Sequence, residues 1–252
     1  MEYATQFADP AVAVAYANRP AYPAEVFDVL AGLVVEPQVA LDAGCGTGDL
    51  TIPLARKVRH VDAVDPSMPM LAAGRSRPGG ADPRIRWIAG RMEDVPLAPR
   101  YGLVAAAESL HWMDWDVVLP RMGGVLAPDG VLAIVGRQEE ANPWWPETLE
   151  LITRYSTNRA YRPYDLIVEL ERRGLFRRGG AVQTNAIVVE QTIGEYVESV
   201  HSRNGFSRDR MAPEAQQAFD RSLREVLALH ASDGTVRFAV SASIVWGRPA
   251  PS

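Results

Sequence analysis

Short apolar runs alternate with amphipathic stretches between residues 38 and 136 of the chain. This alternation is typical of strands and helices that form βαβ units on a parallel sheet. The apolar runs predict five strands, at 39–43, 60–65, 85–89, 103–107 and 131–135. The amphipathic stretches between them predict helices at 50–57, 68–75 and 115–126. We therefore expect an α/β core built on a parallel sheet.

Further elements are expected on both sides of this core. Two helices precede it, at 10–17 and 24–33, and four follow it, at 146–155, 164–173, 193–202 and 213–229. Two late strands are expected at 182–189 and 236–245. The pattern predicts a seven-stranded, mostly parallel sheet with helices on both faces and a helical cap from 137–175 and 195–230. We divide the chain into 1–136, the N-terminal helices and core, and 137–252, the cap insertions and the last two strands of the same sheet.

Composition narrows the class of protein. The 252 residues are 47% hydrophobic and 23% charged, which is ordinary for a globular protein. No apolar run approaches the ~18–20 residues that a membrane span needs, and the first residues show no secretory signal. Cys45 is the only cysteine, so no intrachain disulfide can form, and we expect a reducing, cytoplasmic location. The net charge of −5 argues against nucleic acid or an anionic membrane as the main partner.

The most informative segment is VALDAGCGTGDLT, where a hydrophobic strand ends in Asp42 and glycines follow at positions 44, 46 and 48. Glycine has no Cβ, so such a turn can adopt unusual dihedral angles and let a ligand approach the backbone closely. A helix is expected directly behind the turn, and its first N–H groups carry a partial positive charge. In an open parallel sheet this turn lies at the carboxyl ends of the strands, where ligands bind.

Two classes of cofactor compete for this geometry. Dinucleotide-binding enzymes use the spacing GxGxxG, whereas the third glycine here comes one residue earlier, and Asp42 precedes the turn. A carboxylate at this place is badly located for a pyrophosphate but well located for a cationic amine. Asp65 ends the second predicted strand, 17 residues after Gly48, and can accept hydrogen bonds from both hydroxyls of a ribose. Asp65 therefore indicates a ribose in either class.

The motifs LDAGCGTG, VDPSMPML, GRMEDVPL, ESLHW and LAPDGVLAI resemble, in this order, those of class I S-adenosylmethionine-dependent methyltransferases. The resemblance covers residues 10–136 clearly and implies a Rossmann-like fold with S-adenosyl-L-methionine as cofactor and no metal. The segments NRPAYP and SLHW are similar, more narrowly, to the small-molecule branch of this family that includes trans-aconitate methyltransferase.

The resemblance also implies which residues hold the cofactor. Asp42, Gly44 and Gly46 would line its methionine part, and Asp65 would hold the ribose. The remaining predicted contacts to the cofactor are those of Ser67 and Met68 near the ribose and adenine, Met92 and Glu93 beside the adenine, and Arg19 with the methionine carboxylate.

Methyl transfer to a hydroxyl or an amine also needs a group that takes the proton of the acceptor. His111 follows the fourth predicted strand by a few residues and is the leading candidate base, with Glu108 as the weaker one. The alternative for His111 is packing with Trp112 beneath the cofactor. The predicted contacts to the acceptor are Tyr16, Tyr22 and Trp112 around the cofactor, Trp144 and Trp145 as an apolar wall, and Arg203 for an anion.

These observations predict methyl transfer from S-adenosylmethionine to a small-molecule acceptor that offers a carboxylate, a hydroxyl or an amine. One alternative is a protein of the same fold that binds S-adenosylmethionine for a regulatory role or another reaction. A nicotinamide dehydrogenase is disfavoured by the glycine spacing, and a nucleic-acid methyltransferase by the acidic charge balance and the absence of an NPPY-like tetrad.

Overall fold

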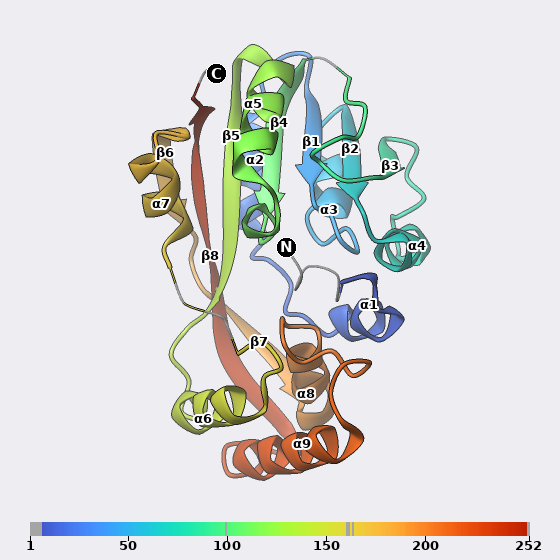
Figure 1. Cartoon of the computed structure of the whole chain (residues 1–252), viewed down its shortest axis with the longest axis vertical. Helices are drawn as coiled ribbons and strands as arrows, with labels where there is room; N and C mark the ends of the chain where they lie inside the picture. Colours follow the sequence, from blue (N-terminus) through green and yellow to red (C-terminus); the bar gives the residue numbers. More distant parts are fainter. Residues whose placement is uncertain (1–6, 99, 160–161, 163, 251–252) are drawn as a thin grey trace. The chain divides into compact units, whose positions relative to one another are not determined.

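The computed structural model describes residues 7–98, 100–159, 162 and 164–250 (Figure 1). The strands are β1 (Val39–Ala43), β2 (His60–Asp65), β3 (Ile85–Ala89), β4 (Tyr101–Ala107), β5 (Leu126–Glu139), β6 (Phe176–Gln183), β7 (Ile187–Thr192) and β8 (Thr235–Pro249). The α-helices are α1 (Pro10–Tyr16), α2 (Glu25–Leu33), α3 (Thr51–Ala55), α4 (Met68–Ser76), α5 (Trp115–Val125), α6 (Trp145–Tyr155), α7 (Leu166–Arg172), α8 (Ile193–His201) and α9 (Pro213–Ala228). The predicted strands at 39–43, 60–65 and 85–89 are confirmed with the same bounds.

The strands form one mostly parallel sheet in the order β3-β2-β1-β4-β5-β8-β6, with β7 paired to β8. Strands β1 to β5 pair in parallel, whereas β6 and β7 run antiparallel to β8. The described sheet has eight strands, so the prediction of seven was wrong by one. The predicted strand at 182–189 is the end of β6 and the start of β7. Between them Thr184 still exchanges hydrogen bonds with Ala242, and the register shifts by one residue from Gln183 opposite Ser243 to Ile187 opposite Val240.

The described residues group into two compact units. The core unit comprises those within 22–138, 163–185 and 242–252, and the accessory unit comprises those within 1–21, 139–162 and 186–241. Helix α7 belongs to the core unit, so its assignment to the cap was wrong. The physical reason is that Leu170 of α7 is completely buried in an apolar cluster that also contains Phe176 of β6.

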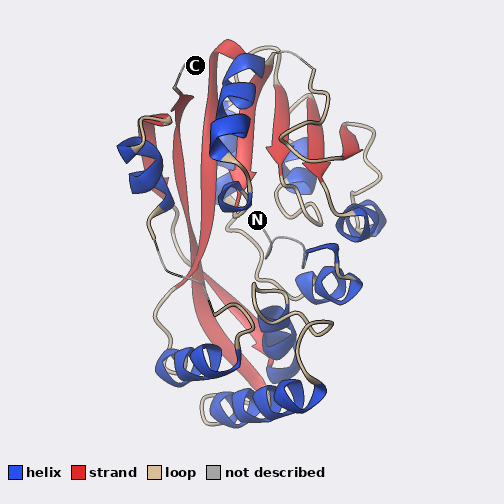
Figure 2. Ribbon diagram, in the orientation of Figure 1, coloured by secondary structure: helices blue, strands red, loops and turns tan. Residues whose placement is uncertain are grey.

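In the core unit the sheet is covered on both faces (Figure 2). Neighbouring residues of a strand point to opposite faces. Ala40 and Leu103 accordingly pack in a cluster with α2 and α3, whereas Leu41 and Val104 pack in a second cluster with α5 and α7. Burial on both faces explains why these strands appear in the sequence as continuous apolar runs.

The accessory unit has an apolar cluster of its own. Trp144 lies at its centre, with Tyr196 and Phe238 in edge-to-face contact at centroid distances of 5.9 and 6.2 Å. Helix α8 begins in a capping box, because the Thr192 hydroxyl accepts from the Glu195 N–H and the Glu195 carboxylate accepts from the Thr192 N–H. In the part of the chain that the structure describes, no helix is long and apolar enough to cross a bilayer.

Candidate cofactor and active site

The turn after β1, the end of β2 and the end of β4 meet at one edge of the core unit. The parallel register pairs Asp42 with Ala63 of β2 and with Ala105 of β4. The carboxyl ends of these strands therefore lie side by side, which is the usual ligand site of an open α/β sheet.

The glycine turn has the left-handed backbone that its sequence predicts. Gly44 and Gly48 have φ of +75° and +81°. A Cβ on Gly44 would lie 2.5 Å from the Cβ of Ser109, so only glycine fits there. The N–H groups of Gly44 and Cys45 both donate to the Val64 carbonyl, at 2.8 and 3.0 Å. The turn is thus tied to the neighbouring strand.

Asp65 braces the same turn. Its Oδ2 accepts from the Gly46 N–H at 2.9 Å and its Oδ1 from the Ser67 N–H at 2.8 Å. Burial raises the pKa of this carboxyl, and the two backbone hydrogen bonds oppose the shift. An ionised carboxylate has about four acceptor sites, so each oxygen keeps capacity for a further donor such as a ribose hydroxyl.

Asp42 is fully buried and only partly satisfied. Its Oδ2 accepts from the Thr51 hydroxyl at 2.5 Å, whereas no group among the described residues donates to its Oδ1. Burial raises the pKa of Asp42 to about 7, against the hydrogen bond from Thr51. A buried polar atom without a partner is costly and needs an explanation. A ligand that brings a positive charge or a donor to this oxygen supplies one.

Cys45 lies in the glycine turn and is buried. Burial raises the pKa of its thiol well above the usual value. The thiol is therefore neutral and unreactive at physiological pH. Across the described residues there is no group of three or more side chains that could hold a metal ion.

The residues predicted near the ribose and adenine lie at the start of α4 and in the loop after β3. Ser67 is the N-cap of α4, with its Oγ accepting from the Met70 N–H, and Met68 is 58% exposed. Met92 is buried in the apolar cluster that contains α5. Glu93 accepts from the Asp114 N–H at 3.1 Å and pairs with Arg91 at 3.3 Å. Contacts of these residues with a cofactor stay predictions.

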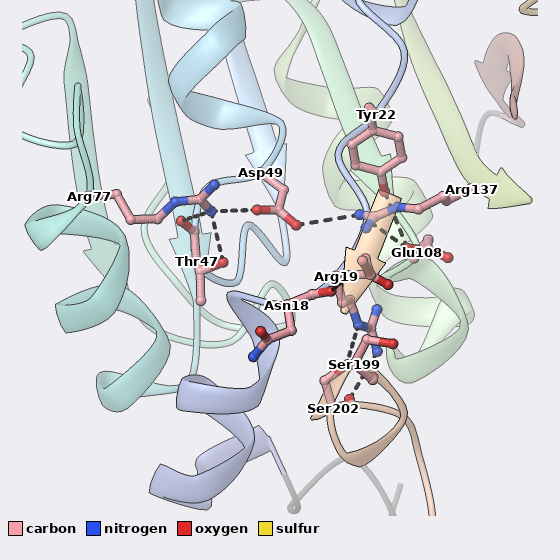
Figure 3. A network of polar contacts seen from close by, with 11 residues as sticks. Asn18, Arg19, Tyr22, Thr47, Asp49, Arg77, Glu108, Arg137, Ser199 and Ser202 are labelled. Atoms are coloured by element: carbon pink, nitrogen blue, oxygen red, sulfur yellow. Dashed lines mark hydrogen bonds and ion pairs between the residues drawn. The ribbon is translucent and has the colours of Figure 1, made fainter. Parts of the chain in front are cut away.

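A second polar network surrounds Arg137, near the end of β5 (Figure 3). The guanidinium Nη2 lies 3.4 Å from Asp49 Oδ2 and 3.6 Å from Glu108 Oε2, and its Cζ lies 4.2 Å from the centre of the Tyr22 ring. The Tyr22 hydroxyl donates to Glu108 at 3.4 Å. The network thus joins the residues that follow β1 and β4.

Arg77 extends this network to the glycine turn. It donates to both oxygens of Thr47, at 3.0 Å to the carbonyl and 3.1 Å to the hydroxyl, and it also pairs with Asp49 (Figure 3). Asp49 therefore lies between two guanidinium groups.

The candidate base His111 lies in the short 3₁₀ helix Leu110–Trp112 and is exposed. Its ring is 4.5 Å from that of Trp112, which is half-buried. This geometry is compatible with either predicted role of His111, and both stay predictions.

Three predicted contact residues belong to the accessory unit and have partners there. Arg19 donates from Nε to the Ser202 hydroxyl at 2.8 Å and from Nη2 to the Ser202 carbonyl at 2.9 Å (Figure 3). Its guanidinium also lies over the ring of Tyr16, at 4.1 Å from the centroid. Arg203 pairs with Glu139. The predicted roles of Arg19 with a carboxylate, Tyr16 with the acceptor and Arg203 with an anion are not tested by these contacts.

The two predicted tryptophans of the accessory unit differ in exposure. Trp144 is only 2% exposed in the apolar cluster, and its burial there favours packing over the predicted contact with an acceptor. Trp145, the next residue, begins α6 and is 40% exposed.

Two residues at the edge of the core unit were missed by the sequence interpretation. The Ser109 hydroxyl donates to the Ala43 carbonyl at 2.5 Å, and so holds the loop after β4 against the glycine turn. Arg137 is a charged residue directly after an apolar strand, and that position was the one available signal for it.

Comparisons with known proteins agree with this geometry. Residues 40–130 match the family described as "Methyltransferase domain". The chain is 35% identical to an uncharacterized methyltransferase of Mycobacterium tuberculosis over 139 residues, which are 54% of this chain and 55% of that protein. It is 33% identical to the ubiquinone biosynthesis O-methyltransferase of Bradyrhizobium diazoefficiens over 95 residues, which are 37% of this chain and 38% of that protein. The chain thus spans about half the length, or less, of these curated relatives.

Solved structures share the fold over most of the chain. A candidate type II methyltransferase from Anaeromyxobacter dehalogenans has a TM-score of 0.64 at 23% identity, covering 93% of this chain and 99% of that one. A geranyl diphosphate methyltransferase crystallised with its cofactor has a TM-score of 0.50 at 17% identity, covering 89% and 84%.

The fold is α/β and Rossmann-like, as predicted, and it is shared with these solved structures. The residues 40–130 that match the methyltransferase-domain family include the glycine turn, Asp65 and Glu108. The narrower resemblance to trans-aconitate methyltransferase stays a prediction.

Proposed function

We propose that this chain is an S-adenosylmethionine-dependent methyltransferase that acts on a small molecule. The observation that carries the proposal is the pair of buried acids at the glycine turn, Asp42 with its unsatisfied Oδ1 and Asp65 at the end of β2. Two carboxylates beside a glycine-rich turn fit an adenosyl sulfonium, which brings an ammonium group and ribose hydroxyls. Asp42, which directly precedes the turn, fits a pyrophosphate badly, because its negative charge would repel it.

In this proposal Asp42, Gly44 and Gly46 hold the methionine part of S-adenosylmethionine, and Asp65 holds the ribose. Ser67, Met68, Met92 and Glu93 complete the adenosine site. When bound, the cofactor supplies a methyl group on a positively charged sulfur, which is already activated for transfer.

The protein then has to align the acceptor with this methyl group and exclude water. Alignment alone contributes roughly 7–11 kcal/mol in favourable cases. Glu108 and His111 both follow β4 and are the candidates to take a proton from the acceptor. Tyr22 and Trp112 are the proposed acceptor contacts of the core unit, and the roles of Tyr16, Trp145 and Arg203 stay predictions.

The acidic net charge and the names of similar proteins support a small molecule rather than nucleic acid. The relatives and structures named above include enzymes of ubiquinone biosynthesis and of geranyl diphosphate methylation. A cytoplasmic location is part of the same proposal and rests on the single, buried cysteine.

The direct test is incubation of the purified chain with labelled S-adenosylmethionine and a mixture of phenols, amines and carboxylates. We expect label in a small-molecule product and S-adenosylhomocysteine as the second product, both measured by mass spectrometry. Calorimetry with S-adenosylhomocysteine separates the alternative, a protein that binds the cofactor in a regulatory role. Binding without any labelled product would favour that alternative, and the absence of binding would refute both.

A further inference from the structure

Arg137 is the most deeply buried guanidinium at the ligand-binding edge of the core unit, with 7% of its side chain exposed, compared with 41% for Arg77. It contacts the Tyr22 ring on one side and the carboxylates of Asp49 and Glu108 on the other (Figure 3). Since its charge is already shared between two acids and an aromatic ring, a direct role in binding an acceptor is disfavoured. Its effect on a bound molecule has to pass through one of the residues that it holds.

Glu108 is the more accessible member of this network, with 28% of its side chain exposed. Its backbone is strained, with a φ of +51° at a residue that is not glycine. The Glu108 N–H donates to the Val135 carbonyl at 2.9 Å, and the next residue, Ser109, is hydrogen-bonded to Ala43. Such strain persists only where the surroundings enforce it, and it is concentrated at active sites. The fold therefore fixes the Glu108 carboxylate at the carboxyl ends of the strands.

The charges at this edge also discriminate between classes of acceptor. Asp49 and Glu108 both pair with the one guanidinium of Arg137, at 3.4 and 3.6 Å. An acceptor carboxylate brought against Glu108 would meet a like charge, whereas a neutral or cationic group would not.

We propose that Arg137 is a positioning residue that aims Glu108 at the acceptor, and that the acceptor is a neutral or cationic small molecule bearing a hydroxyl or an amine. This inference rests on the proposed function and narrows its range of acceptors. The acceptor oxygen or nitrogen forms the bond to the methyl carbon, the carbon–sulfur bond breaks with its electron pair left on sulfur, and the acceptor proton passes to Glu108. A carboxylate acceptor has no proton to lose and would gain nothing from Glu108.

The first experiment tests the class of acceptor. The chain is incubated with labelled S-adenosylmethionine and three series that share one aromatic ring: phenols, benzylamines and benzoates. We expect methylated phenol or benzylamine. Label confined to the benzoates would overturn the acceptor class, and label in none of the series would overturn the inference as a whole.

The second experiment tests Glu108 and Arg137 with the best acceptor of the first. Glu108→Gln should lower kcat by about 10²-fold or more, because the acceptor proton has lost its destination. Arg137→Met should lower kcat by about 10²-fold, since a carboxylate displaced by about 1 Å is a poor base. Arg137→Lys, which keeps the charge but not the planar fork, should recover part of the rate.

Binding measurements distinguish positioning from a collapse of the site. S-adenosylhomocysteine should bind Arg137→Met and Glu108→Gln within about twofold of the wild-type affinity by calorimetry. The control is Arg86→Met, which removes a guanidinium that pairs with Asp62 elsewhere in the sheet, and it should leave kcat unchanged.

The outcomes separate the two proposals. If S-adenosylhomocysteine does not bind the wild-type chain, the proposed function fails. If it binds and methyl transfer proceeds, but Arg137→Met retains the wild-type kcat and pH profile, the role of Arg137 alone is refuted. A loss of S-adenosylhomocysteine affinity in Arg137→Met that matches its loss of rate would also refute positioning, because it would indicate a general disruption of the site.

Discussion

Two buried aspartates on neighbouring strands of one sheet have opposite surroundings. Asp62 of β2 is paired in register with Leu41, the residue before Asp42 on β1, so the two acids point to opposite faces of the sheet. Asp62 accepts from Arg86 through both oxygens, at 2.8 and 2.6 Å, from Tyr101 at 2.5 Å and from His60 at 3.0 Å. Asp42 accepts one hydrogen bond, from Thr51, and its second oxygen has no donor among the described residues.

The pKa values follow from this difference. Burial acts to raise the pKa of Asp62, but hydrogen bonds from Arg86 and Tyr101 outweigh it and leave the pKa below its usual value. Burial acts on Asp42 as well, and with only Thr51 to oppose it the pKa rises to about 7. Asp62, with hydrogen-bond donors on both oxygens, is part of the scaffold. Asp42 at the glycine turn keeps one oxygen without a donor among the described residues, and this oxygen is available to a ligand. The number of donors, more than burial, therefore separates the pKa values of these two carboxylates.

The largest effect on stability is expected from Asp62→Ala. Removing this carboxylate leaves the Tyr101 hydroxyl buried without its acceptor and Arg86 without its partner, which should lower the free energy of unfolding by about 3 kcal/mol. Arg86 is half-exposed and can be rehydrated, which limits the loss. Urea denaturation measures it, and the affinity for S-adenosylhomocysteine should be unchanged below the transition. A stability equal to that of the wild type would contradict the scaffold role.

Asp42→Asn should raise the free energy of unfolding, the opposite of Asp62→Ala, and the size of this increase should depend on pH. The folded chain holds the Asp42 proton up to about pH 7, whereas the unfolded chain releases it near 3.8, so the wild type loses stability as pH rises between these values. The variant lacks this loss. It should match the wild type near pH 4 and be more stable by a few kcal/mol above pH 7.

Thermal or urea unfolding at pH 4.5 and 7.5 provides this comparison for Asp42→Asn. The same variant should bind S-adenosylhomocysteine more weakly, because the charge that faces the ammonium group has been removed. A stability difference that does not change between the two pH values would show that Asp42 ionises freely in the folded chain.

The smallest of the three effects is expected from Asp65→Ala. Its loss removes the acceptor of the ribose hydroxyls and should weaken S-adenosylhomocysteine binding more than tenfold, or about 1.4 kcal/mol. It also removes the hydrogen bonds from Gly46 and Ser67, so a second ligand is needed to separate the two causes. A 2′,3′-dideoxy analogue of S-adenosylhomocysteine should bind the wild type and the variant with nearly equal affinity. A tenfold loss with this analogue too would assign Asp65 to bracing the turn alone.

The short strands could be predicted accurately, whereas the long ones could not. Strands β1 to β3 have the predicted bounds because apolar runs of five or six residues end at clear turn signals. Strand β5 was predicted at 131–135 and spans Leu126–Glu139, because its ends carry polar residues that resemble loop. Pairing with neighbouring strands, which the local sequence does not encode, keeps those residues extended.

The two halves of the candidate site also differ in how far they could be predicted. Asp42 and Asp65 were found from their spacing around the glycines, because a turn and the strand beside it are close in sequence. Arg137 and Ser109 were missed, since their partners Asp49, Glu108 and Ala43 come from other strands.

The sequence by itself determined the order of strands and helices, the left-handed turn that requires glycine, and the two acids beside it. These features depend on local dihedral angles and on hydrophobic periodicity, which act over a few residues. The tertiary structure alone decided how many donors reach each buried carboxylate, and with that in which direction its pKa shifts. Donors such as Arg86, Tyr101 and Arg137 reach their partners only after the strands have paired, so the electrostatics of the site follow from the assembled sheet.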